Sequence, residues 1–458
     1  MKATRKYSPE PGGRAVRTAW LLITRTWTLS AVLLSALLGP SAAAAQGGME
    51  GRWKGVIVRD SAATAFWLDL ERDADDWRGS FSFPEQRVLQ YPLAKVNVAL
   101  PKITIVGPDN GFTMEGTISD DRLDGIFNDG GSAATVRLTR SAPEEAPYTT
   151  EDVHFANGDV TLAGSLDIPR GDGPFPAVIF LHGAGPEIRW GASRFFSDYF
   201  ARRGIAALIY DKRGAGQSTG DWRRADFNAL AADALAGLRL LKAHPRIDPA
   251  RIGIYGHSQG GTIAPLVASQ ARDIAFVVSA AGGAIPMWQS EIHSLRTQVR
   301  ARGVTGDALE RADAFIDQTI AVARSGKGWP QLDAEWKSAE KRGEPWAALL
   351  HPAPQNSYFW PFFATIAEYD AADYWRKVTV PVLVVQAGED IYAPREQSIA
   401  AIDVALREAG HSDFTILELP RAPHNFVLQP DATRLLTWPR LYPGYVDLLV
   451  SWIQYRMK

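Results

Sequence analysis

The sequence predicts an α/β fold with a mostly parallel, doubly wound sheet, preceded by a small all-β domain. Three observations support this prediction. Nearly continuous apolar runs recur after residue 148, helical stretches separate several of them, and residues 49–140 instead form short alternating runs. Continuous apolar runs suit parallel strands that are buried on both faces, whereas alternation is typical of antiparallel strands with one face in water.

Residues 1–45 have the pattern of an export signal. A basic leader over 2–17 precedes an apolar core over 27–39, and small residues at 42–45 offer a cleavage site. The apolar core is too short to span a bilayer comfortably. We therefore expect a cleaved signal peptide and an exported protein, periplasmic or extracellular. An uncleaved anchor that begins at Trp20 is the alternative.

The composition is that of an ordinary globular protein, with 46% apolar and 22% charged residues in 458. A net charge of −2 and the lack of a basic stripe argue against nucleic acid as a partner. The chain has no Cys, which excludes disulfides and thiolate metal sites. We expect a small-molecule partner and no stable membrane span after signal cleavage, and the oligomeric state stays open.

Residues 49–140 are expected to form the all-β N-terminal domain. Gly, Asp and Asn punctuate its short runs at roughly ten-residue spacing, which favours an antiparallel meander in a small barrel or sandwich. The expected strands are GRWKGVIV, AFWLDLE, WRGSFSF, KITIVG, FTMEGTI, RLDGIFN and ATVRLTR. Trp53, Trp67 and Trp77 are either exposed aromatics that bind carbohydrate or a cell surface, or core residues. The Pro- and Glu-rich segment 141–147 is expected to be a linker.

Residues 148–458 are expected to form the α/β domain. DVHFA and VTLAGSLDI suggest an opening hairpin, and a helix is expected over 227–244. Alternating strands and helices imply a doubly wound sheet. A Trp-rich, Pro-punctuated helical segment, about 285–375, is expected to be a cap insertion above the sheet. The expected parallel strands are 177–182, 205–210, 251–256, 274–280 and 380–386.

The stretch IYGHSQGGTIAP places Ser258 between Gly256 and Gly260, where a buried strand is expected to become a helix. A serine hydroxyl is a poor nucleophile and must be presented bare to its base, which a tight turn between a strand and a helix achieves. The turn crowds its flanking residues, so glycines suit them. The amide of Gln259, at the start of the helix, is then placed to receive an oxyanion.

A second small-residue loop, FLHGAG, follows the expected strand 177–182. Such a loop can supply a second backbone donor to an oxyanion. The N–H of Ala184 is the expected donor, with Gly183 and Gly185 as neighbouring alternatives.

The base and its orienting acid should follow the nucleophile in the order Ser, Asp, His. His424, in PRAPHNF, follows the last apolar strand and is the expected base. Asp390, in QAGEDIYAP, directly follows the strand 380–386, where a carboxylate can hold the imidazole tautomer. The adjacent Glu389 is the alternative acid.

A further glycine-rich stretch, YDKRGAGQSTGDW, ends the expected strand 205–210. Its glycines allow close packing of this loop beside FLHGAG. We expect Asp211 and Arg213 to be structural, and a pair between the two side chains is one arrangement.

Together these motifs resemble the α/β-hydrolase superfamily, in particular its serine esterase and its dienelactone-hydrolase-like or peptidase-S9-like branches. The resemblance covers about residues 150–458. It rests on HGAG, DKRGAGQS, GHSQGG, GEDIYAP and PHNF. It implies that Ser258 is the nucleophile, His424 the base and Asp390 the acid, and that Ala184 and Gln259 line the oxyanion hole.

The resulting hypothesis is a secreted serine esterase that works through an acyl-enzyme and needs no metal or organic cofactor. Trp288, Phe359 and Trp360 either line an apolar acyl pocket or form the insertion's own core. An exopeptidase or amidase of the peptidase-S9-like type is the first alternative, with a short peptide as substrate. The second is a non-enzymatic binding protein on the same fold.

Overall fold

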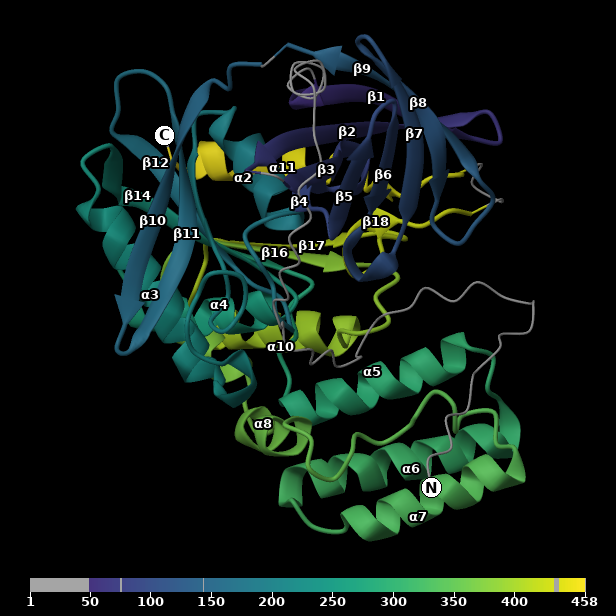
Figure 1. Cartoon of the computed structure of the whole chain (residues 1–458). Coiled ribbons are helices and arrows are strands. Elements are labelled where there is room, and N and C mark those ends of the chain that lie inside the picture. The colour runs from purple at the N-terminus through teal and green to yellow at the C-terminus, as the bar shows by residue number, and fades with distance from the viewer. Residues whose placement is uncertain (1–48, 75, 143, 432–435, 458) are drawn as a thin grey trace. The chain divides into compact units, whose positions relative to one another are not determined.

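In the computed structural model the described residues begin at Met49, so the expected export signal over 1–45 lies outside them. The described residues are 49–458 with the exception of 75, 143, 432–435 and 458. Their strands form a nine-stranded sheet, an eight-stranded sheet and a two-stranded sheet (Figure 1). The short sheet consists of β18 (Val427–Leu428) and β19 (Arg440–Leu441).

The eight-stranded sheet has the order β10-β11-β13-β12-β14-β15-β16-β17. Its first two pairings are antiparallel and all later ones are parallel. Each expected apolar run corresponds to one of the strands β12 to β16, and the expected opening hairpin is β10 with β11. The strands are β10 (Tyr148–Asn157), β11 (Val160–Pro169), β12 (Phe175–Leu181), β13 (Ala206–Tyr210), β14 (Ile247–His257), β15 (Val277–Ala280), β16 (Val382–Ala387) and β17 (Phe414–Leu419).

Helices cover both faces of this sheet, as a doubly wound fold requires (Figure 1). On one face α3 (Phe227–Ala243), α4 (Gln259–Gln270) and α10 (Arg395–Glu408) contribute to one buried apolar cluster. On the other face α2 (Ala192–Ala201) and α11 (Tyr445–Arg456) contribute to a second. The short 3-10 turn η4 (Trp222–Arg224) precedes α3. The prediction of a doubly wound α/β sheet is therefore confirmed.

The nine-stranded sheet is all-β and has the order β2-β1-β9-β8-β7-β6-β5-β3-β4, with an added pairing of β2 to β3. That pairing closes the ladder, so the sheet is barrel-like. Seven of its strands were expected, whereas β4 and β5 were not. The elements are β1 (Gly51–Arg59), β2 (Ala62–Asp73), β3 (Asp76–Phe83), η2 (Pro84–Gln86), β4 (Val88–Pro92), β5 (Lys95–Ala99), β6 (Lys102–Val106), η3 (Pro108–Asn110), β7 (Thr113–Ser119), β8 (Arg122–Asn128) and β9 (Ala134–Ser141).

The three tryptophans of the all-β region all pack against apolar clusters, but only one of them is fully buried. Trp53 is 0% exposed in the barrel core, so the surface-binding interpretation is wrong for it. Trp77 is partly buried against the same core, and Trp67 packs against a core cluster of the eight-stranded sheet. Conversely, a residue from the C-terminal part of the chain lies in the barrel core. Trp438 packs there and donates its indole N–H to the Ala62 carbonyl at 2.9 Å.

The two large sheets are also joined through the strand β4. Leu89 and Gly191 exchange two backbone hydrogen bonds of 3.2 and 2.9 Å. The guanidinium of Arg194, on α2, donates to the amide oxygen of Gln90 at 2.9 Å. Arg194 is itself held by the buried carboxylate of Asp167 at 2.8 Å, which stabilises its position in the core.

A helical insertion separates β15 from β16 (Figure 1). It consists of α5 (Met287–Ala301), α6 (Gly306–Ser325), α7 (Trp329–Arg342), α8 (Phe359–Ile366) and α9 (Ala372–Trp375). Whereas α9 packs into a cluster of the eight-stranded sheet, helices α5 to α8 share a buried apolar cluster of their own. Trp288, Phe359 and Trp360 all belong to or pack against that cluster, which favours the core interpretation over an acyl pocket.

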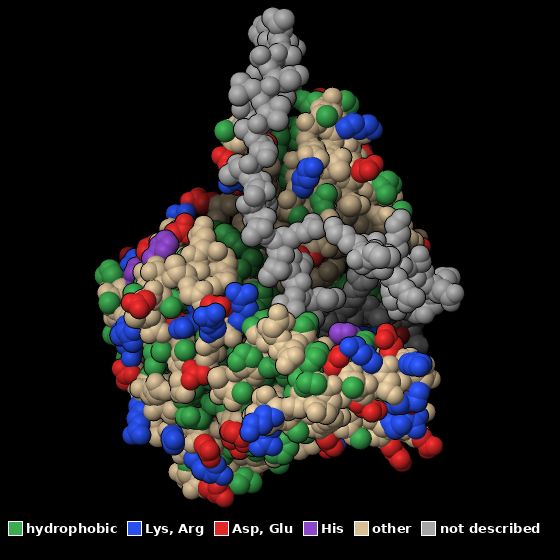
Figure 2. Space-filling view, turned by 60° about the horizontal axis from the view of Figure 1, so that its bottom comes forward, with side chains coloured by type: hydrophobic (Ala, Val, Ile, Leu, Met, Phe, Trp, Pro, Cys, Tyr) green, Lys and Arg blue, Asp and Glu red, His purple; other side chains and the backbone are tan. Residues whose placement is uncertain are grey.

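The surface carries both signs of charge. Figure 2 shows Lys and Arg side chains interspersed with Asp and Glu over one face, in keeping with the net charge of −2. Among the residues that the structure describes, no helix is both long enough and apolar enough to cross a bilayer.

Candidate active site

Ser258 occupies a sharp turn between β14 and α4. Its φ of 56° and ψ of −120° are strained for a residue with a side chain. The flanking glycines permit the turn, because a Cβ on Gly256 would lie 2.2 Å from the Gly260 carbonyl oxygen. A Cβ on Gly260 would lie 2.4 Å from the Leu181 carbonyl oxygen. The turn therefore exists only with glycine on both sides of Ser258, and it holds the hydroxyl away from its own backbone.

His424 lies between β17 and β18, and its ring connects two other side chains. Nε2 is 2.9 Å from the Oγ of Ser258, and Nδ1 is 2.7 Å from the Oδ2 of Asp390. An ionised carboxylate only accepts hydrogen bonds, so Nδ1 carries the proton and Nε2 is free to accept from the hydroxyl. Three groups that are far apart in the sequence thus meet in series at the carboxyl edge of the parallel strands.

Asp390, and not Glu389, contacts the ring. The Asp390 side chain is 0% exposed, and its Oδ1 accepts the backbone N–H groups of Tyr392 at 2.8 Å and Ala393 at 2.9 Å. These two hydrogen bonds stabilise the buried charge and aim Oδ2 at the imidazole. Glu389 is exposed.

His257, next to the serine, supports the backbone of His424. Its Nε2–H donates to the carbonyl oxygen of His424 at 3.0 Å. Burial, with smaller contributions from the charges of Arg87 and His424, lowers the pKa of His257 well below its usual range. The ring is therefore neutral at physiological pH, which is the form that keeps one N–H for this carbonyl and adds no charge beside the site.

The loop that follows β12 approaches the start of α4. Ala184 is exposed and Gln259 is half-buried, and neither backbone N–H donates a hydrogen bond within the described part of the chain. The N–H of Gly183, an alternative donor, is already occupied by the Oε2 of Glu187 at 2.8 Å. Among the described residues the amides of Ala184 and Gln259 are thus left without an acceptor, which is the state a donor to an oxyanion needs before reaction.

The loop that follows β13 braces the one after β12. Asp211 is 2% exposed and accepts the backbone N–H groups of Arg189 and Gln217, each at 2.9 Å. Arg213 instead pairs with Asp233 of α3 at 2.6 Å. The expected structural role of both residues agrees with these contacts, but a pair between them is wrong, because each finds its own partner.

Lys212 lies between these residues and was not singled out from the sequence. Its ammonium is buried and donates to the Gly183 carbonyl at 2.8 Å and to the Oε1 of Gln259 at 2.7 Å. Sequence reasoning also missed His257 and Glu187. Lys212 and His257 stand inside the quoted motifs, but only contacts across the fold give them a role.

The insertion reaches this region through α5, α8 and the segment between α8 and α9. The hydroxyl of Tyr369 donates to the Thr262 carbonyl of α4 at 3.0 Å. Trp222 makes edge contacts with Tyr358 and Phe362. Burial lowers the pKa of His293 on α5, and the nearby charge of Asp390 partly opposes that shift.

A strand-to-helix serine, an imidazole and a buried carboxylate on a doubly wound sheet define an α/β hydrolase of the serine hydrolase class. Comparison with known families agrees. The chain belongs to the family described as "serine aminopeptidase, S33", whose model matches residues 172–431.

Relatives of the chain carry both esterase and peptidase names. Esterase EstD of Thermotoga maritima is 25% identical over 274 residues, which is 58% of this chain and 59% of EstD. The uncharacterized peptidase YuxL of Bacillus subtilis is 30% identical over 138 residues, or 29% of this chain and 20% of YuxL. The solved esterase PF2001 of Pyrococcus furiosus has a TM-score of 0.44 at 16% identity, over 69% of this chain and 95% of that one.

Proposed function

We propose that the protein hydrolyses carboxylic esters through an acyl-enzyme, with Ser258 as nucleophile, His424 as general base and Asp390 as the orienting acid. The hydrogen-bonded series of Oγ, imidazole and carboxylate carries this proposal, with distances of 2.9 and 2.7 Å. Each donor already lies within hydrogen-bond reach of its acceptor, as general base catalysis requires.

The chemistry follows from these contacts. The Oγ of Ser258 attacks the ester carbonyl while Nε2 of His424 takes its proton, and Asp390 stabilises the resulting imidazolium. The imidazolium returns the proton to the departing alcohol, which leaves an ester on Oγ. Water, deprotonated by the same ring, then releases the acid and restores the hydroxyl.

The N–H groups of Ala184 and Gln259 are proposed to receive the negative oxygen of the tetrahedral intermediates. Their lack of an acceptor in the described part of the chain supports this role. One such donor lowers the barrier by roughly 3 kcal/mol in a related type of site.

The helical insertion is proposed to be a cap over the site. The influence of Asp390 on His293 and the contacts of Trp222 with Tyr358 and Phe362 support a location beside the catalytic loops. A cap excludes water and shapes the acyl or alcohol pocket.

Cleavage of a peptide or amide is the second candidate function. The family description and the name of YuxL favour it, and the name of EstD favours ester cleavage. A serine, imidazole and carboxylate series serves both reactions. Comparing the kcat/KM of short p-nitrophenyl esters with that of dipeptide anilides separates the two, and a higher value for the anilides would replace the ester proposal.

Replacing Ser258 tests the proposal directly. Ser258→Ala is expected to lower kcat for short p-nitrophenyl esters by at least about 10⁴-fold, because the nucleophile is lost. The free energy of unfolding is expected to change by less than about 1 kcal/mol. Ser325→Ala, at an exposed position on α6, is the matched control. Equal turnover in the Ser258 variant and the control would reject the assignment.

We also propose that the protein is exported. The basic leader, the apolar core and the small residues of 1–45 support this proposal. N-terminal sequencing of protein purified from a periplasmic or culture fraction is expected to begin near residue 46, and recovery of the intact N-terminus from the cytoplasm would contradict it.

A further inference from the structure

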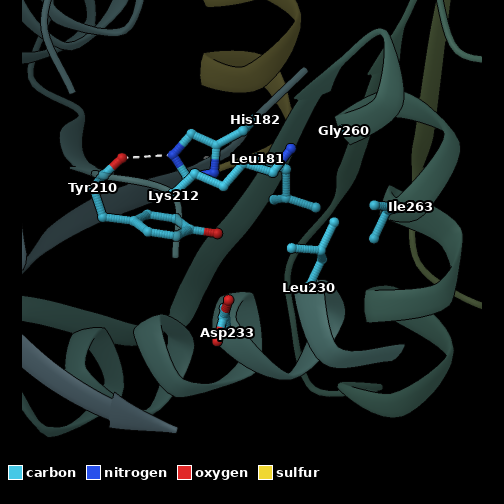
Figure 3. Close-up of a pocket in the computed structure, with 8 residues that line it drawn as sticks. All are labelled: Leu181, His182, Tyr210, Lys212, Leu230, Asp233, Gly260 and Ile263. Atoms are coloured by element: carbon cyan, nitrogen blue, oxygen red, sulfur yellow. Dashed lines mark hydrogen bonds between the residues drawn. The ribbon is translucent and has the colours of Figure 1, made fainter. Parts of the chain in front are cut away.

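Lys212 is a buried cation held by two neutral oxygens. It is 3% exposed, and its Nζ donates to the Gly183 carbonyl at 2.8 Å and to the Oε1 of Gln259 at 2.7 Å. Among the described residues, no carboxylate lies within 4.0 Å of the ammonium. Figure 3 shows its side chain beside His182, running across a small pocket toward Gly260. A buried charge without an ion pair is costly, so the burial of this ammonium calls for a functional explanation.

The first acceptor belongs to the same peptide unit as the proposed oxyanion donor. In a planar trans peptide the C=O of one residue and the N–H of the next point in opposite directions. The Gly183 carbonyl points at the buried ammonium, so the Ala184 N–H points away from it. The ammonium therefore fixes the direction of this N–H.

The other end of the Gly183 residue is fixed as well. Its N–H donates to the Oε2 of Glu187 at 2.8 Å, and the Glu187 carbonyl accepts the backbone N–H of Lys212 at 3.0 Å. A Cβ on Gly183 would lie 2.7 Å from the Oε1 of Glu187, so a larger residue there would displace this carboxylate. Gly183 is thus held at both its N–H and its carbonyl, so the peptide unit that carries the Ala184 N–H cannot rotate freely.

The second acceptor connects Lys212 to the other proposed donor. Gln259 is the first residue of α4, so its side chain anchors the segment that carries its own free N–H. One ammonium therefore links the two segments that present Ala184 and Gln259. The positive charge of the ammonium beside the Gly183 carbonyl also polarises this peptide and makes the Ala184 N–H a stronger donor.

We propose that Lys212 is a positioning residue that fixes the spacing of the Ala184 and Gln259 amides and strengthens the Ala184 donor. This inference rests on the proposed function of Ser258. Lys212 does not touch the reacting atoms. It acts through a peptide that forms its best hydrogen bond when the carbonyl oxygen of the substrate becomes negative, so its removal should affect kcat more than KM.

The inference predicts a pH dependence. Burial lowers the pKa of Lys212 to about 8, and the charges of Glu187 and Asp233 partly oppose the shift. The other titratable groups that line the pocket are His182, with a pKa near 3, and Tyr210, whose pKa burial raises. Neither changes charge near pH 8. Above pH 8 the amine is neutral and polarises the peptide less, so kcat should fall as the pH rises from 7 to 9.

Lys212→Met, which keeps a long unbranched side chain and removes the charge, is the main test. We expect kcat for a short ester to fall by about 10- to 100-fold with KM within about threefold, which is less than the loss of a whole donor. The decline of kcat between pH 7 and 9 should disappear. Lys242→Met removes an ammonium that pairs with Asp273 at the surface, and should change neither quantity.

A boronic acid that mimics the tetrahedral intermediate gives a readout beyond turnover. Its affinity should fall in Lys212→Met in parallel with kcat/KM, while the affinity for the carboxylate product stays the same. Lys212→Arg, which restores a charge, should recover part of kcat. Equal boronate affinity in wild type and Lys212→Met, or an unchanged decline at high pH, would overturn the inference.

Two arrangements keep the test decisive. If Lys212→Met does not fold, Gln259→Met removes one acceptor and keeps the backbone amide, and it should lower kcat and boronate affinity by a smaller factor. No change in that variant would overturn the link to α4. Loss of turnover in Ser258→Ala with full turnover in Lys212→Met would reject this inference alone, whereas ester turnover in Ser258→Ala would reject the proposed function.

Discussion

The loops at the carboxyl edge of the eight-stranded sheet and the helical insertion hold their side chains in different ways. In the loops, contacts with backbone groups fix most of the side chains. Glycines pack against carbonyls, and buried charges such as that of Asp390 accept hydrogen bonds from peptide N–H groups. In the insertion, α5 to α8 pack around their own apolar cluster, with ion pairs outside. We infer that single changes in the loops mainly affect chemistry, whereas changes in the insertion mainly affect its stability.

The largest expected effect lies in the loops. Asp390→Asn should lower kcat by about 10⁴-fold, because an amide no longer enforces the tautomer in which Nε2 of His424 accepts a proton. Ester turnover at pH 7 to 8 measures this loss. Glu389→Gln changes the neighbouring exposed carboxylate in the same manner and should stay within about threefold of wild type. A larger loss in Glu389→Gln than in Asp390→Asn would break the assignment of the acid.

The next effect concerns the insertion core. Trp346 is 1% exposed and its ring lies 4.9 Å from that of Phe315. Trp346→Ala should destabilise the insertion by about 3–5 kcal/mol through lost burial and a cavity. Hydrogen exchange should show weaker protection on α6 and α7, and unchanged protection on β14 and α4.

Its control is Lys337→Ala, which breaks an exposed pair with Asp333 on α7 and should cost no more than about 0.5 kcal/mol. Equal loss of protection in β14 and in α6 after Trp346→Ala would show that the two regions unfold as one unit, and the comparison would fail.

The smallest expected effect is pH-dependent. Burial raises the pKa of Glu291, on α5, from 4.5 to about 7. The folded protein therefore binds this proton more tightly than the unfolded chain. The contribution of the protonated Glu291 to the free energy of unfolding is fully present below pH 4.5 and is lost as the pH rises to about 7. Glu291→Gln removes this dependence.

Unfolding by urea at pH 5 and pH 8 measures the difference. Wild type should lose about 1–2 kcal/mol relative to Glu291→Gln between these values, a figure reduced from the full linkage because the side chain retains some solvent contact. An equal change in the free energy of unfolding between pH 5 and pH 8 in both proteins would mean that Glu291 ionises at little cost. In that case α5 is more open than its packing indicates.

The sequence predicts the central sheet better than the barrel because of burial. Strands β12 to β16 are buried on both faces and read as apolar runs. In contrast β4 and β5 went unrecognised, because β4 pairs with β3 across a register shift and ends at Pro92, and β5 is mostly exposed. Alternation is hard to recognise in strands of five residues such as these.

The order of the motifs along the chain predicts which side chains meet in the site, because the loops after parallel strands share one edge of the sheet. Ser258, Asp390 and His424 follow this rule. The contacts of Lys212 lie at the same edge, but nothing in the motifs marks this lysine as buried, because lysines are mostly exposed in folded proteins. The hydrogen bond from His257 to the carbonyl of His424 was not predicted either, because it ends on a backbone atom that the sequence motifs do not single out.

The account depends on His424 activating Ser258, and a fluorophosphonate probe tests this claim most directly. Peptide mapping of labelled wild-type protein should place a single phosphonyl group on Ser258, since only an activated hydroxyl reacts quickly. His424→Ala should slow that labelling by at least about 10³-fold. A label on another residue, or an equal rate in His424→Ala, would contradict the account.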